Sequence, residues 1–383
     1  MKILYLTTVL PSGKKTGGEI ASQCFINALK YSGHEVFVVG YQRPNDINSE
    51  NSHEIVVEQR YIETEKSKYH PFLWMALSLG QQLPYSAAKY YSQKYLTKIK
   101  DILQVNDYDI IIIDHAQLGW LLPLLGQKSQ IIFIAHNVEH QLYETQLKAA
   151  KKYVSKYIYK REARLIKRME DNLAASSKQV WTLTSDDSNY FYTQNKSSKV
   201  FHLPSSWTIP SKNSATKNCD IGIIGSWTWK ANKSGLEWFF QAVYPHLPTN
   251  ISIHVAGSGA KWLIERYPNV KYCGFVTDAQ AFMGLAKVIA IPSVSGGGIQ
   301  IKTLDAIASG SPIVATNVAM RGISTYPSAI KIADDPKSFA RSLMQLLAFK
   351  KAEQEKLLDN RLTWSVLRRE HFYDSVKSTI ISM

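Results

Sequence analysis

Apolar segments, each followed by a glycine-containing loop and a helix-spaced segment, constrain the fold of this chain most strongly. Ile3–Leu10 is a continuous apolar run, the helix-spaced segment Ile20–Tyr31 follows its loop, and Glu35–Tyr41 has the pattern of a second strand. A continuously apolar strand is typical of a parallel sheet that helices cover on both faces. Strand, helix and strand in this order form a βαβ unit, so the pattern predicts a doubly wound α/β sheet.

The same pattern begins again in the second half of the chain. Ile221–Gly225 is expected to form a strand, and Leu236–Val243 is expected to form a helix. Between the halves, residues 204–218 are rich in proline, serine and asparagine, which is typical of a linker. A chain of 383 residues is long enough for two domains. We therefore predict two α/β domains with a cleft between them.

The composition excludes several classes of protein. Hydrophobic residues make up 45% of the chain and charged residues 20%, which indicates a folded globular protein. No run of 18 apolar residues occurs, so no transmembrane helix is expected, and the apolar start of the chain is interpreted as a strand. Three cysteines lie far apart, which disfavours a disulfide framework and favours a reducing compartment: Cys24, Cys219 and Cys273.

The charge balance points to an anionic partner. The chain has 45 lysines and arginines against 31 aspartates and glutamates, a formal net charge of +14. Such an excess is typical of proteins that meet nucleic acid, an anionic membrane surface or a phosphorylated ligand.

The segment 292–315 carries the most specific signal. Three glycines lie between a predicted strand and a predicted helix: Gly296, Gly297 and Gly298. Glycine lets a backbone approach an anion closely, and the start of a helix offers free N–H groups. Lys302 falls in the first turn of the helix, where a cation is disfavoured unless a phosphate offsets the repulsion. Asp305, one turn further on, is suited to accept hydrogen bonds from sugar hydroxyls. A flexible turn with a solvated lysine is the alternative.

This segment resembles the donor-binding motif of glycosyltransferases with the two-Rossmann GT-B fold, and is most similar to the large retaining family four. Three other segments agree with the resemblance: Gly17-Gly18, His136-Asn137-Val138-Glu139 and Gly225–Asn232. The resemblance extends from residue 1 to about residue 365 and is weakest over 45–105.

The resemblance implies an arrangement of domains and an activity. Residues 1–203 would form an acceptor-binding domain, to which the helix 365–383 returns, and 204–218 the linker. Residues 219–364 would bind a nucleotide sugar, with a UDP-sugar expected ahead of a GDP-sugar. The expected reaction moves the sugar to a glycan or lipid-linked acceptor in cell-surface polysaccharide or glycolipid synthesis.

Motif and resemblance together give the expected donor-binding residues: Gly17, Gly18, Ser226, Trp227, Gly296, Gly297, Gly298, Ile299, Lys302 and Asp305. Negative charge grows on the departing diphosphate, so fixed cations lower the barrier. Lys230 and Lys302 are the expected cations, and no Asp-x-Asp triplet accompanies the motif, which favours a metal-free mechanism. Trp227 and Trp229 lie close to Lys230 in the sequence. A tryptophan here would either stack on the base of the nucleotide or be buried in the core.

One feature departs from the family pattern. The commoner pattern has two glutamates separated by seven residues, and the corresponding positions here are Gly297 and Asp305. The sugar contact is then expected from backbone amides or another loop, and retention against inversion stays open.

Histidines and glutamates follow several predicted strands and loops. The resemblance gives His115 a catalytic place near the reacting sugar, with a structural hydrogen-bonding role as the alternative. His136 and Glu139 are candidates for the acceptor pocket, with a capping or ion-pairing role as the alternative for Glu139. Glu19 is either a helix cap or an acceptor contact. His136 and His140 have the helical spacing of zinc ligands, but a third ligand is not recognisable, so no metal is expected.

Two further segments bear on partners. Residues 148–168 contain nine basic residues and one acidic residue, so they fit an anionic membrane surface, a solvated face or nucleic acid. The resemblance favours the membrane: we expect a cytoplasmic protein, peripheral on the inner face of the membrane, without nucleic acid. Residues 69–96 are rich in large apolar side chains, which indicates ordinary core or an acceptor groove.

Two other functions fit the same donor motif. A GT-B nucleotide-sugar epimerase would convert the donor without an acceptor. A non-catalytic protein that binds nucleotide sugars or polyanions would release no nucleotide diphosphate.

Overall fold

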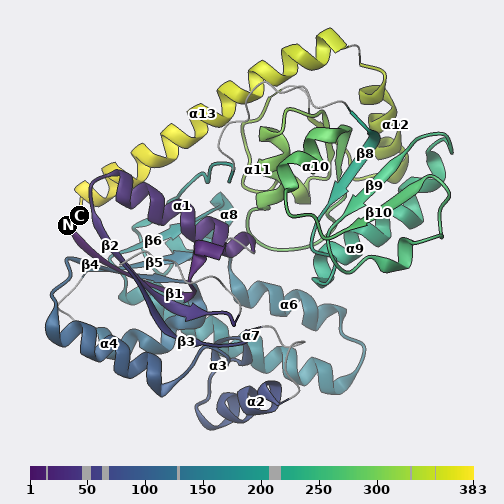
Figure 1. Cartoon of the computed structure of the whole chain (residues 1–383). Coiled ribbons are helices and arrows are strands. Elements are labelled where there is room, and N and C mark those ends of the chain that lie inside the picture. Colours follow the sequence, from purple (N-terminus) through teal and green to yellow (C-terminus); the bar gives the residue numbers. More distant parts are fainter. Residues whose placement is uncertain are drawn as a thin grey trace. The chain divides into compact units, whose positions relative to one another are not determined.

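The computed structural model describes residues 1–13, 16–44, 53–62, 69–126, 130–206, 217–327, 330–349 and 351–383, without the side chains of 351–359 (Figure 1). The chain divides into two compact units. The first contains Met1–Phe201 and Phe372–Met383, and the second contains His202–His371. The limits of the two units differ by a few residues from the domain boundaries that the sequence predicts at residues 203 and 364. Most of the expected linker, residues 207–216, lies outside the described residues.

The first unit is built on a parallel sheet. Within its described residues the sheet has seven strands, in the order β3-β2-β1-β4-β5-β6-β7. The strands are β1 (Lys2–Val9), β2 (Glu35–Gln42), β3 (Glu54–Gln59), β4 (Ile110–Asp114), β5 (Gln130–Ala135), β6 (Gln179–Thr182) and β7 (Ser198–Val200). The side chains of β4 are all buried, as its isoleucine run predicts.

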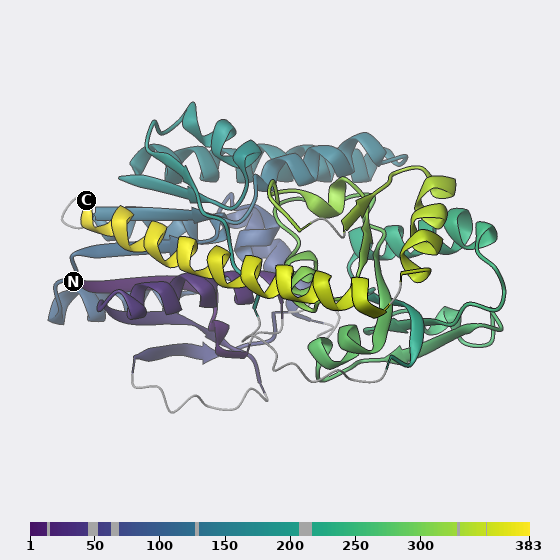
Figure 2. The same ribbon diagram turned by 90° about the horizontal axis from the view of Figure 1, so that it is seen from above.

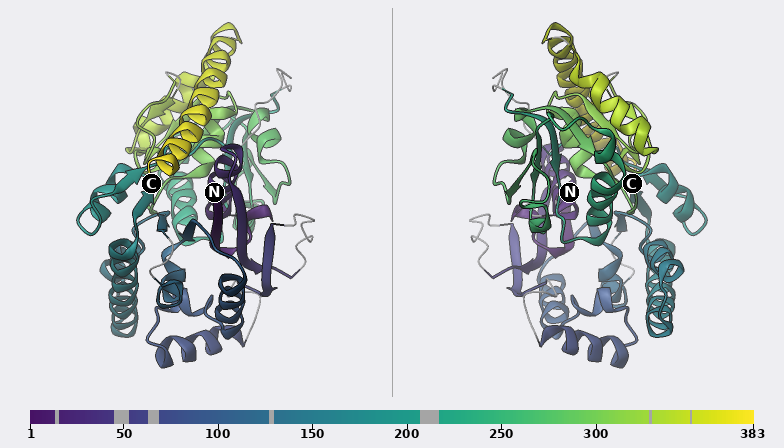
Figure 3. Two further views of the ribbon diagram at one scale, coloured as in Figure 1. Left: turned by 90° about the vertical axis from the view of Figure 1, so that its left-hand side faces the viewer. Right: turned by 90° about the vertical axis from the view of Figure 1, so that its right-hand side faces the viewer.

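Helices connect the strands of the first unit. They are α1 (Gly17–Tyr31), α2 (His70–Gly80), α3 (Tyr85–Ala88), α4 (Gln93–Val105), α5 (Leu122–Leu125), α6 (Glu139–Ala149), α7 (Tyr153–Ser176) and α8 (Ser185–Tyr192). Both chain termini belong to this unit (Figure 3). Within the described residues, every helix is too short or too polar to cross a bilayer.

The second unit repeats this architecture with six described strands, in the order β10-β9-β8-β11-β12-β13. They are β8 (Cys219–Ile224), β9 (Ile253–Ala256), β10 (Val270–Gly274), β11 (Ala286–Ile291), β12 (Ile313–Ala315) and β13 (Ile330–Ile332). Its helices are α9 (Lys230–Trp238), α10 (Ala279–Leu285), α11 (Ile301–Ala308), α12 (Pro336–Leu347) and most of α13 (Lys351–Ile381). The helix expected at 236 therefore begins earlier, at Lys230, and continues as a π-helical turn over Phe239–Val243.

The long helix α13 belongs to both units (Figure 2). Its last part contributes Phe372 to an aromatic cluster of the first unit, with ring centroids 5.1 Å from Phe25 and 6.4 Å from Phe201. Trp181 of β6 completes the cluster, 4.6 Å from Phe201.

Candidate functional site

The strand order of each sheet reverses at one place, and this place positions the candidate site. In the first unit the reversal lies between β1 and β4, and in the second between β8 and β11. Loops that leave two such strands run to opposite faces of the sheet, so a crevice opens at the carboxyl ends. The loops after β1, β4, β8 and β11 contain most of the residues singled out from the sequence.

In the second unit, the helices α9 and α11 begin immediately after these loops, and no acidic side chain neutralises the positive dipole at their starts. Neither the N-cap residue of α9, Trp229, nor that of α11, Gln300, makes a side-chain cap bond, and neither first turn contains an acidic residue. Their first N–H groups and positive dipole ends are therefore open to an anion. Each helix also carries a lysine in its first turn, Lys230 in α9 and Lys302 in α11.

Lys302 lacks a carboxylate partner among the described residues. Its Nζ donates to Oδ1 of Asn232 at 3.0 Å and lies 6.0 Å from the ring centroid of Trp227. Burial lowers the pKa of Lys302 to about 8, because the charged ammonium has lost part of its hydration. A phosphate beside this nitrogen would raise the pKa of Lys302 back toward its ordinary value. Lys230 is exposed.

Asn232 was missed in the sequence, although it holds Lys302. Its Nδ2 donates to the carbonyl of Ser226 at 3.0 Å while its Oδ1 accepts from Lys302. The side chain thus ties the loop after β8 to the start of α11. Asn232 ends the segment Gly225–Asn232 that the sequence singled out, but nothing in that segment indicates a contact with Lys302, 70 positions away.

The glycine turn before α11 adopts a backbone that only glycine takes readily. The φ angles are 128° at Gly296 and 59° at Gly298, in the left-handed region. Arg321 donates from Nη2 to the carbonyl of Gly296, a contact that the sequence did not reveal. Gly297 and Ile299 are partly exposed between this turn and α11.

Trp227 is packed inside the second unit. Only 2% of it is exposed, and its Nε1 donates to the carbonyl of Ala256 at 2.9 Å. Of the two open interpretations, the structure therefore shows burial in the core. Trp229, which is 52% exposed, is the tryptophan of this loop that is free to stack on a base.

The carboxylate of Asp305 is hydrogen-bonded by two serines of the segment that precedes β8. Its Oδ1 accepts from Ser205 Oγ at 3.0 Å, Ser206 N at 2.9 Å and Ser206 Oγ at 2.8 Å. Burial raises the pKa of Asp305 to about 6, although these hydrogen bonds oppose the shift. Sugar hydroxyls would have to use the second carboxylate oxygen or displace the serines. Residues 100 positions apart gave no sequence signal for this contact.

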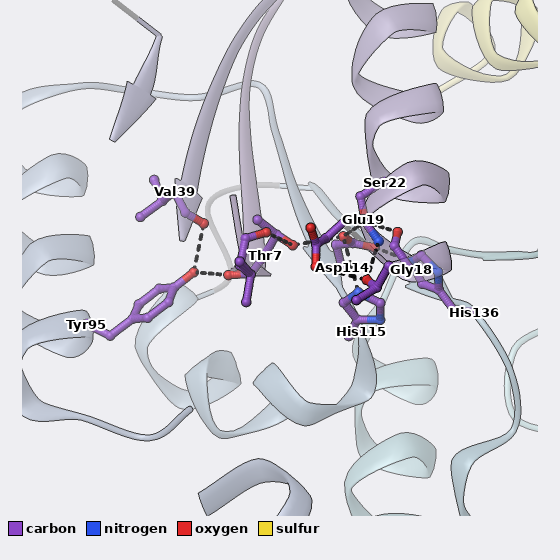
Figure 4. A network of polar contacts seen from close by, with 11 residues as sticks. Thr7, Gly18, Glu19, Ser22, Val39, Tyr95, Asp114, His115 and His136 are labelled. Atoms are coloured by element: carbon purple, nitrogen blue, oxygen red, sulfur yellow. Dashed lines mark hydrogen bonds and ion pairs between the residues drawn. The ribbon is translucent and has the colours of Figure 1, made fainter. Parts of the chain in front are cut away.

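In the first unit, a buried aspartate organises the carboxyl ends of β1 and β4 (Figure 4). Asp114 accepts from Thr7 Oγ1 at 3.0 Å and Ser22 Oγ at 2.5 Å, and its Oδ1 lies 2.6 Å from Nε2 of His136. Burial disfavours its charge, but His115, His136 and the hydrogen bonds outweigh that effect and lower the pKa of Asp114 to about 2. Asp114 therefore remains a carboxylate inside the protein.

The two histidines lie against each other beside this carboxylate. The ring centroids of His115 and His136 are 3.9 Å apart and the rings are stacked. Burial and the neighbouring His136 lower the pKa of His115 to about 4, so its imidazole is neutral near pH 7. A Cβ on Gly18 would lie 3.3 Å from Cε1 of His115, so the glycine loop before α1 is fitted closely to this ring. His115 itself has φ 81°, an uncommon backbone for a residue with a side chain.

Glu19 lies in the first turn of α1, where its side chain and its backbone N–H both contact the N-cap residue, Thr16. Its Oε1 accepts from Thr16 Oγ1 at 2.9 Å and from Arg43 Nη2 at 2.6 Å, and its backbone N–H donates to Thr16 Oγ1 at 3.3 Å. Thr16 is thus the N-cap residue of α1, and the Glu19 carboxylate in the first turn accepts from its hydroxyl. Arg43, in the loop after β2, is buried with Glu19.

Glu139 begins α6 beside a second carboxylate. Burial and the nearby Glu170 raise the pKa of Glu139 to about 7. Glu170 accepts from the backbone N–H groups of Glu139 and His140 at 2.6 and 3.2 Å, and it lies 2.9 Å from Nδ1 of His140. His136 contacts Asp114 and His140 contacts Glu170, so the four-residue spacing does not produce a shared metal site.

Two other observations concern metals. In the described part of the chain, Asp114, His115 and His136 have ligand atoms within 4.8 Å of one another, close enough to hold an ion. The sequence does contain an Asp-x-Asp triplet, Asp107-Tyr108-Asp109, so the absence of such a triplet cannot support a metal-free mechanism. The triplet precedes β4 and therefore lies at the amino edge of the sheet, where Asp109 accepts from the backbone of Lys2 at 2.7 Å.

Two Rossmann-type sheets in separate units place the chain in the GT-B fold class, and solved structures share this fold. Sucrose-phosphate synthase from Thermosynechococcus elongatus has a TM-score of 0.70 and 15% identity, over 100% of this chain and 98% of that one. HepE from Anabaena, solved with UDP and glucose, has a TM-score of 0.67 and 15% identity over 100% of both chains. The lipopolysaccharide outer core galactosyltransferase WaaB has a TM-score of 0.59 and 12% identity, over 99% and 100%. At these identities the likeness establishes the fold.

The second unit also matches a known family. Residues 218–348 match the family model described as glycosyl transferases group 1. A relative described as an uncharacterized 44.6 kDa protein in the cps region of Klebsiella pneumoniae is 22% identical over 366 residues, 90% of each protein. The predicted resemblance, GT-B fold and glycosyltransferase class are confirmed.

Proposed function

We propose that the chain transfers a sugar from a UDP-sugar to a glycan or lipid-linked acceptor. The observation that carries this proposal is the start of α11, where an uncapped helix, a glycine turn and Lys302 without a carboxylate partner meet. Each of these features favours a phosphate. HepE, with the same fold, was solved with UDP and with UDP-glucose, which supports uridine as the base.

The proposed mechanism stabilises charge on the departing diphosphate. Lys302, Lys230 and the first N–H groups of α9 and α11 supply fixed positive charge without reorganisation. These groups take the place of a metal ion, and the configuration of the sugar is retained. With glycine at position 297, the sugar is contacted by backbone N–H groups of the turn. In the first unit, the proposed role of His115 is that of a neutral group that hydrogen-bonds a sugar hydroxyl.

The proposed setting is synthesis of a cell-surface polysaccharide or glycolipid at the cytoplasmic face of a membrane. The Klebsiella relative is described as a protein of a cps region, and WaaB as a lipopolysaccharide galactosyltransferase. The basic stretch 148–168 supports contact with an anionic membrane surface.

A donor screen tests the function. The protein is incubated with UDP- and GDP-sugars, with and without a membrane extract as the source of acceptor, and released nucleotide and sugar products are measured. We expect UDP release that depends on the extract, with the sugar recovered in the glycan or lipid fraction. A new sugar nucleotide formed without acceptor would identify an epimerase, and saturable binding without release would identify a binding protein.

Lys302 gives the first specific prediction. Lys302→Ala removes one charge-assisted contact, which contributes roughly 1.5–3 kcal/mol, so turnover should fall about 10- to 100-fold. Lys233→Ala is the matched control, because Lys233 is a lysine of α9 whose Nζ lies 3.8 Å from Glu237. Unchanged turnover in Lys302→Ala would contradict the assigned role.

A further inference from the structure

We propose that a second anion site lies on α13, where Arg361, Ser365 and Arg368 bind the phosphate group of inorganic phosphate or of a sugar phosphate. All three residues of this site, the α13 site, belong to the second unit, which ends at His371. Their spacings of four and three residues place them on one face of the helix. Binding there requires no nucleotide sugar, so it is independent of the proposed function.

Arg361 is a buried cation without a hydrogen-bond acceptor. It is fully buried, and within the described part of the chain its Nε, Nη1 and Nη2 atoms all lack a hydrogen-bond partner. Buried polar groups are almost always hydrogen-bonded, and an unpaired buried charge is costly. Burial lowers the pKa of Arg361 to about 9, so the side chain is still charged near pH 7. A guanidinium in this state favours an oxyanion, to which it can donate two parallel N–H bonds.

The two other residues of the α13 site also have unused donors. Among the described residues, neither the buried Oγ of Ser365 nor the buried Nη2 of Arg368 has a hydrogen-bond partner. The Arg368 side chain is held in place by its Nε, which donates to the carbonyl of Leu203 at 2.6 Å. The ring centroid of Trp364 lies 5.1 Å from its guanidinium carbon. One face of α13 thus presents donors from three side chains that the protein itself leaves without acceptors.

The surroundings of the α13 site are basic. Residues 360–369 contain three arginines and no acidic residue. Lys217 is close enough that the charge of Arg361 adds to the effect of burial and lowers the pKa of Lys217. Its Nζ donates to the carbonyl of Gly284 at 2.8 Å and to Ser311 Oγ at 3.0 Å, both uncharged acceptors. A phosphate dianion can offset more than one of these positive charges, whereas a carboxylate or chloride offsets only one.

The end of the α13 site beside Lys217 lies at the opposite edge of the sheet from the donor motif. Lys217 precedes β8, and its partners Gly284 and Ser311 precede β11 and β12. These are the amino ends of parallel strands, whereas Lys302 follows the carboxyl end of β11. The six residues of β11 separate the two edges by about 20 Å. A phosphate bound beside Arg361 therefore does not take the place of the donor diphosphate.

Thermal unfolding of the full chain tests the proposal, with inorganic phosphate as the probe and sodium chloride at equal ionic strength as the reference. We expect phosphate to raise the unfolding temperature saturably, by roughly 3–6 °C at ten times its dissociation constant. Arg361→Met should abolish the rise, and Ser365→Ala should weaken phosphate binding roughly three- to tenfold. Hexose 1-phosphate and hexose 6-phosphate, titrated separately, show whether a sugar phosphate binds more tightly than free phosphate.

The stability of Arg361→Met without phosphate is a second readout. This variant should unfold no earlier than the wild type, because an apolar side chain replaces an unpaired buried charge. A much lower unfolding temperature in phosphate-free buffer would show that Arg361 already has a partner in the protein, and would contradict the proposal.

Two control variants separate the α13 site from the donor site and from general effects of charge. Lys302→Ala should keep the phosphate response, because Lys302 belongs to the donor motif. Arg341→Met, which removes an exposed arginine of α12, should keep it as well. The proposal is overturned by a wild-type protein that does not respond to phosphate, by a response that survives Arg361→Met, or by one that Lys302→Ala abolishes. None of these results bears on the release of UDP from a UDP-sugar, which tests the proposed function separately.

Discussion

At the scale of single residues, the environment at the end of β4 keeps Asp114 charged and its neighbour His115 neutral. Asp114 keeps its charge because Thr7, Ser22 and His136 surround it with hydrogen-bonding groups. His115 lies 3.8 Å from the same carboxylate, but burial and the stacked ring of His136 keep it neutral. A neutral imidazole beside a fixed carboxylate can donate and accept hydrogen bonds, as binding of a sugar hydroxyl requires.

This environment predicts a specific pH dependence of stability. The pKa of His115 is about 4 in the folded protein and near 6.5 in the unfolded chain. Between these values the unfolded chain binds more protons, so the His115 contribution is complete above pH 6.5 and is lost as the pH falls toward 4. The integrated loss is about 3 kcal/mol.

The variant His115→Asn isolates this contribution, because asparagine tolerates a positive φ better than most residues. Urea unfolding from pH 7 to pH 4 should show a decline in unfolding free energy that is about 3 kcal/mol smaller in the variant. Parallel pH profiles for the two proteins would contradict the environment assigned to His115.

At the scale of elements, the helices differ in how their positive ends are neutralised. Glu19 supplies an acid in the first turn of α1, and Glu170 of α7 accepts from the first N–H groups of α6. The helices α9 and α11 have no such acid and carry Lys230 and Lys302 instead. The unneutralised ends lie in the segment 218–348 that matches the group 1 glycosyltransferase model, where a diphosphate is proposed to bind.

Glu170 provides the prediction at this scale. Glu170→Ala leaves two N–H groups of α6 and the ring of His140 without their acceptor, and should lower the unfolding free energy by about 2–4 kcal/mol. Glu170→Gln keeps one acceptor oxygen and should lose less. Chemical denaturation of both variants measures the difference. Equal losses would show that the carboxylate charge, and not the acceptor atom, holds the start of α6.

At the scale of the whole molecule, one strand order is used twice and α13 belongs to both units. Each sheet reverses its order once, which places the Asp114 cluster and the Lys302 site at the carboxyl ends of comparable strands. The end of α13 is fixed in the first unit by Phe372, which packs on Phe25 and Phe201.

Loss of this ring should destabilise the first unit. Phe372 is fully buried, and truncation of a buried phenylalanine to alanine costs about 3–5 kcal/mol through lost burial and a cavity. Phe372→Ala should therefore shift the thermal transition of the first unit downward, with Trp181 emission as its local probe. Leu367→Ala, which alters a 59% exposed residue of the same helix, should shift it little. A small effect of Phe372→Ala would show that the end of α13 is not held by this cluster.

The sequence by itself determined the α/β class, the two halves and the donor motif. These features depend on local patterns: apolar runs, glycines between strand and helix, and a lysine in a first turn. Local sterics and burial fix such elements whatever their neighbours are. The residues from Gly296 to Lys302 could therefore be predicted as a donor site from the sequence alone.

Only the tertiary structure decided which side chains meet. Asn232 on Lys302, Ser205 and Ser206 on Asp305, and Ser22 on Asp114 join residues 70 to 100 positions apart, and no local pattern encodes such pairs. It also decided that Trp227 is buried and that Phe72 is exposed, because both have the apolar character of core residues. Whether an apolar side chain is covered depends on what packs over it, and that is settled by the fold as a whole.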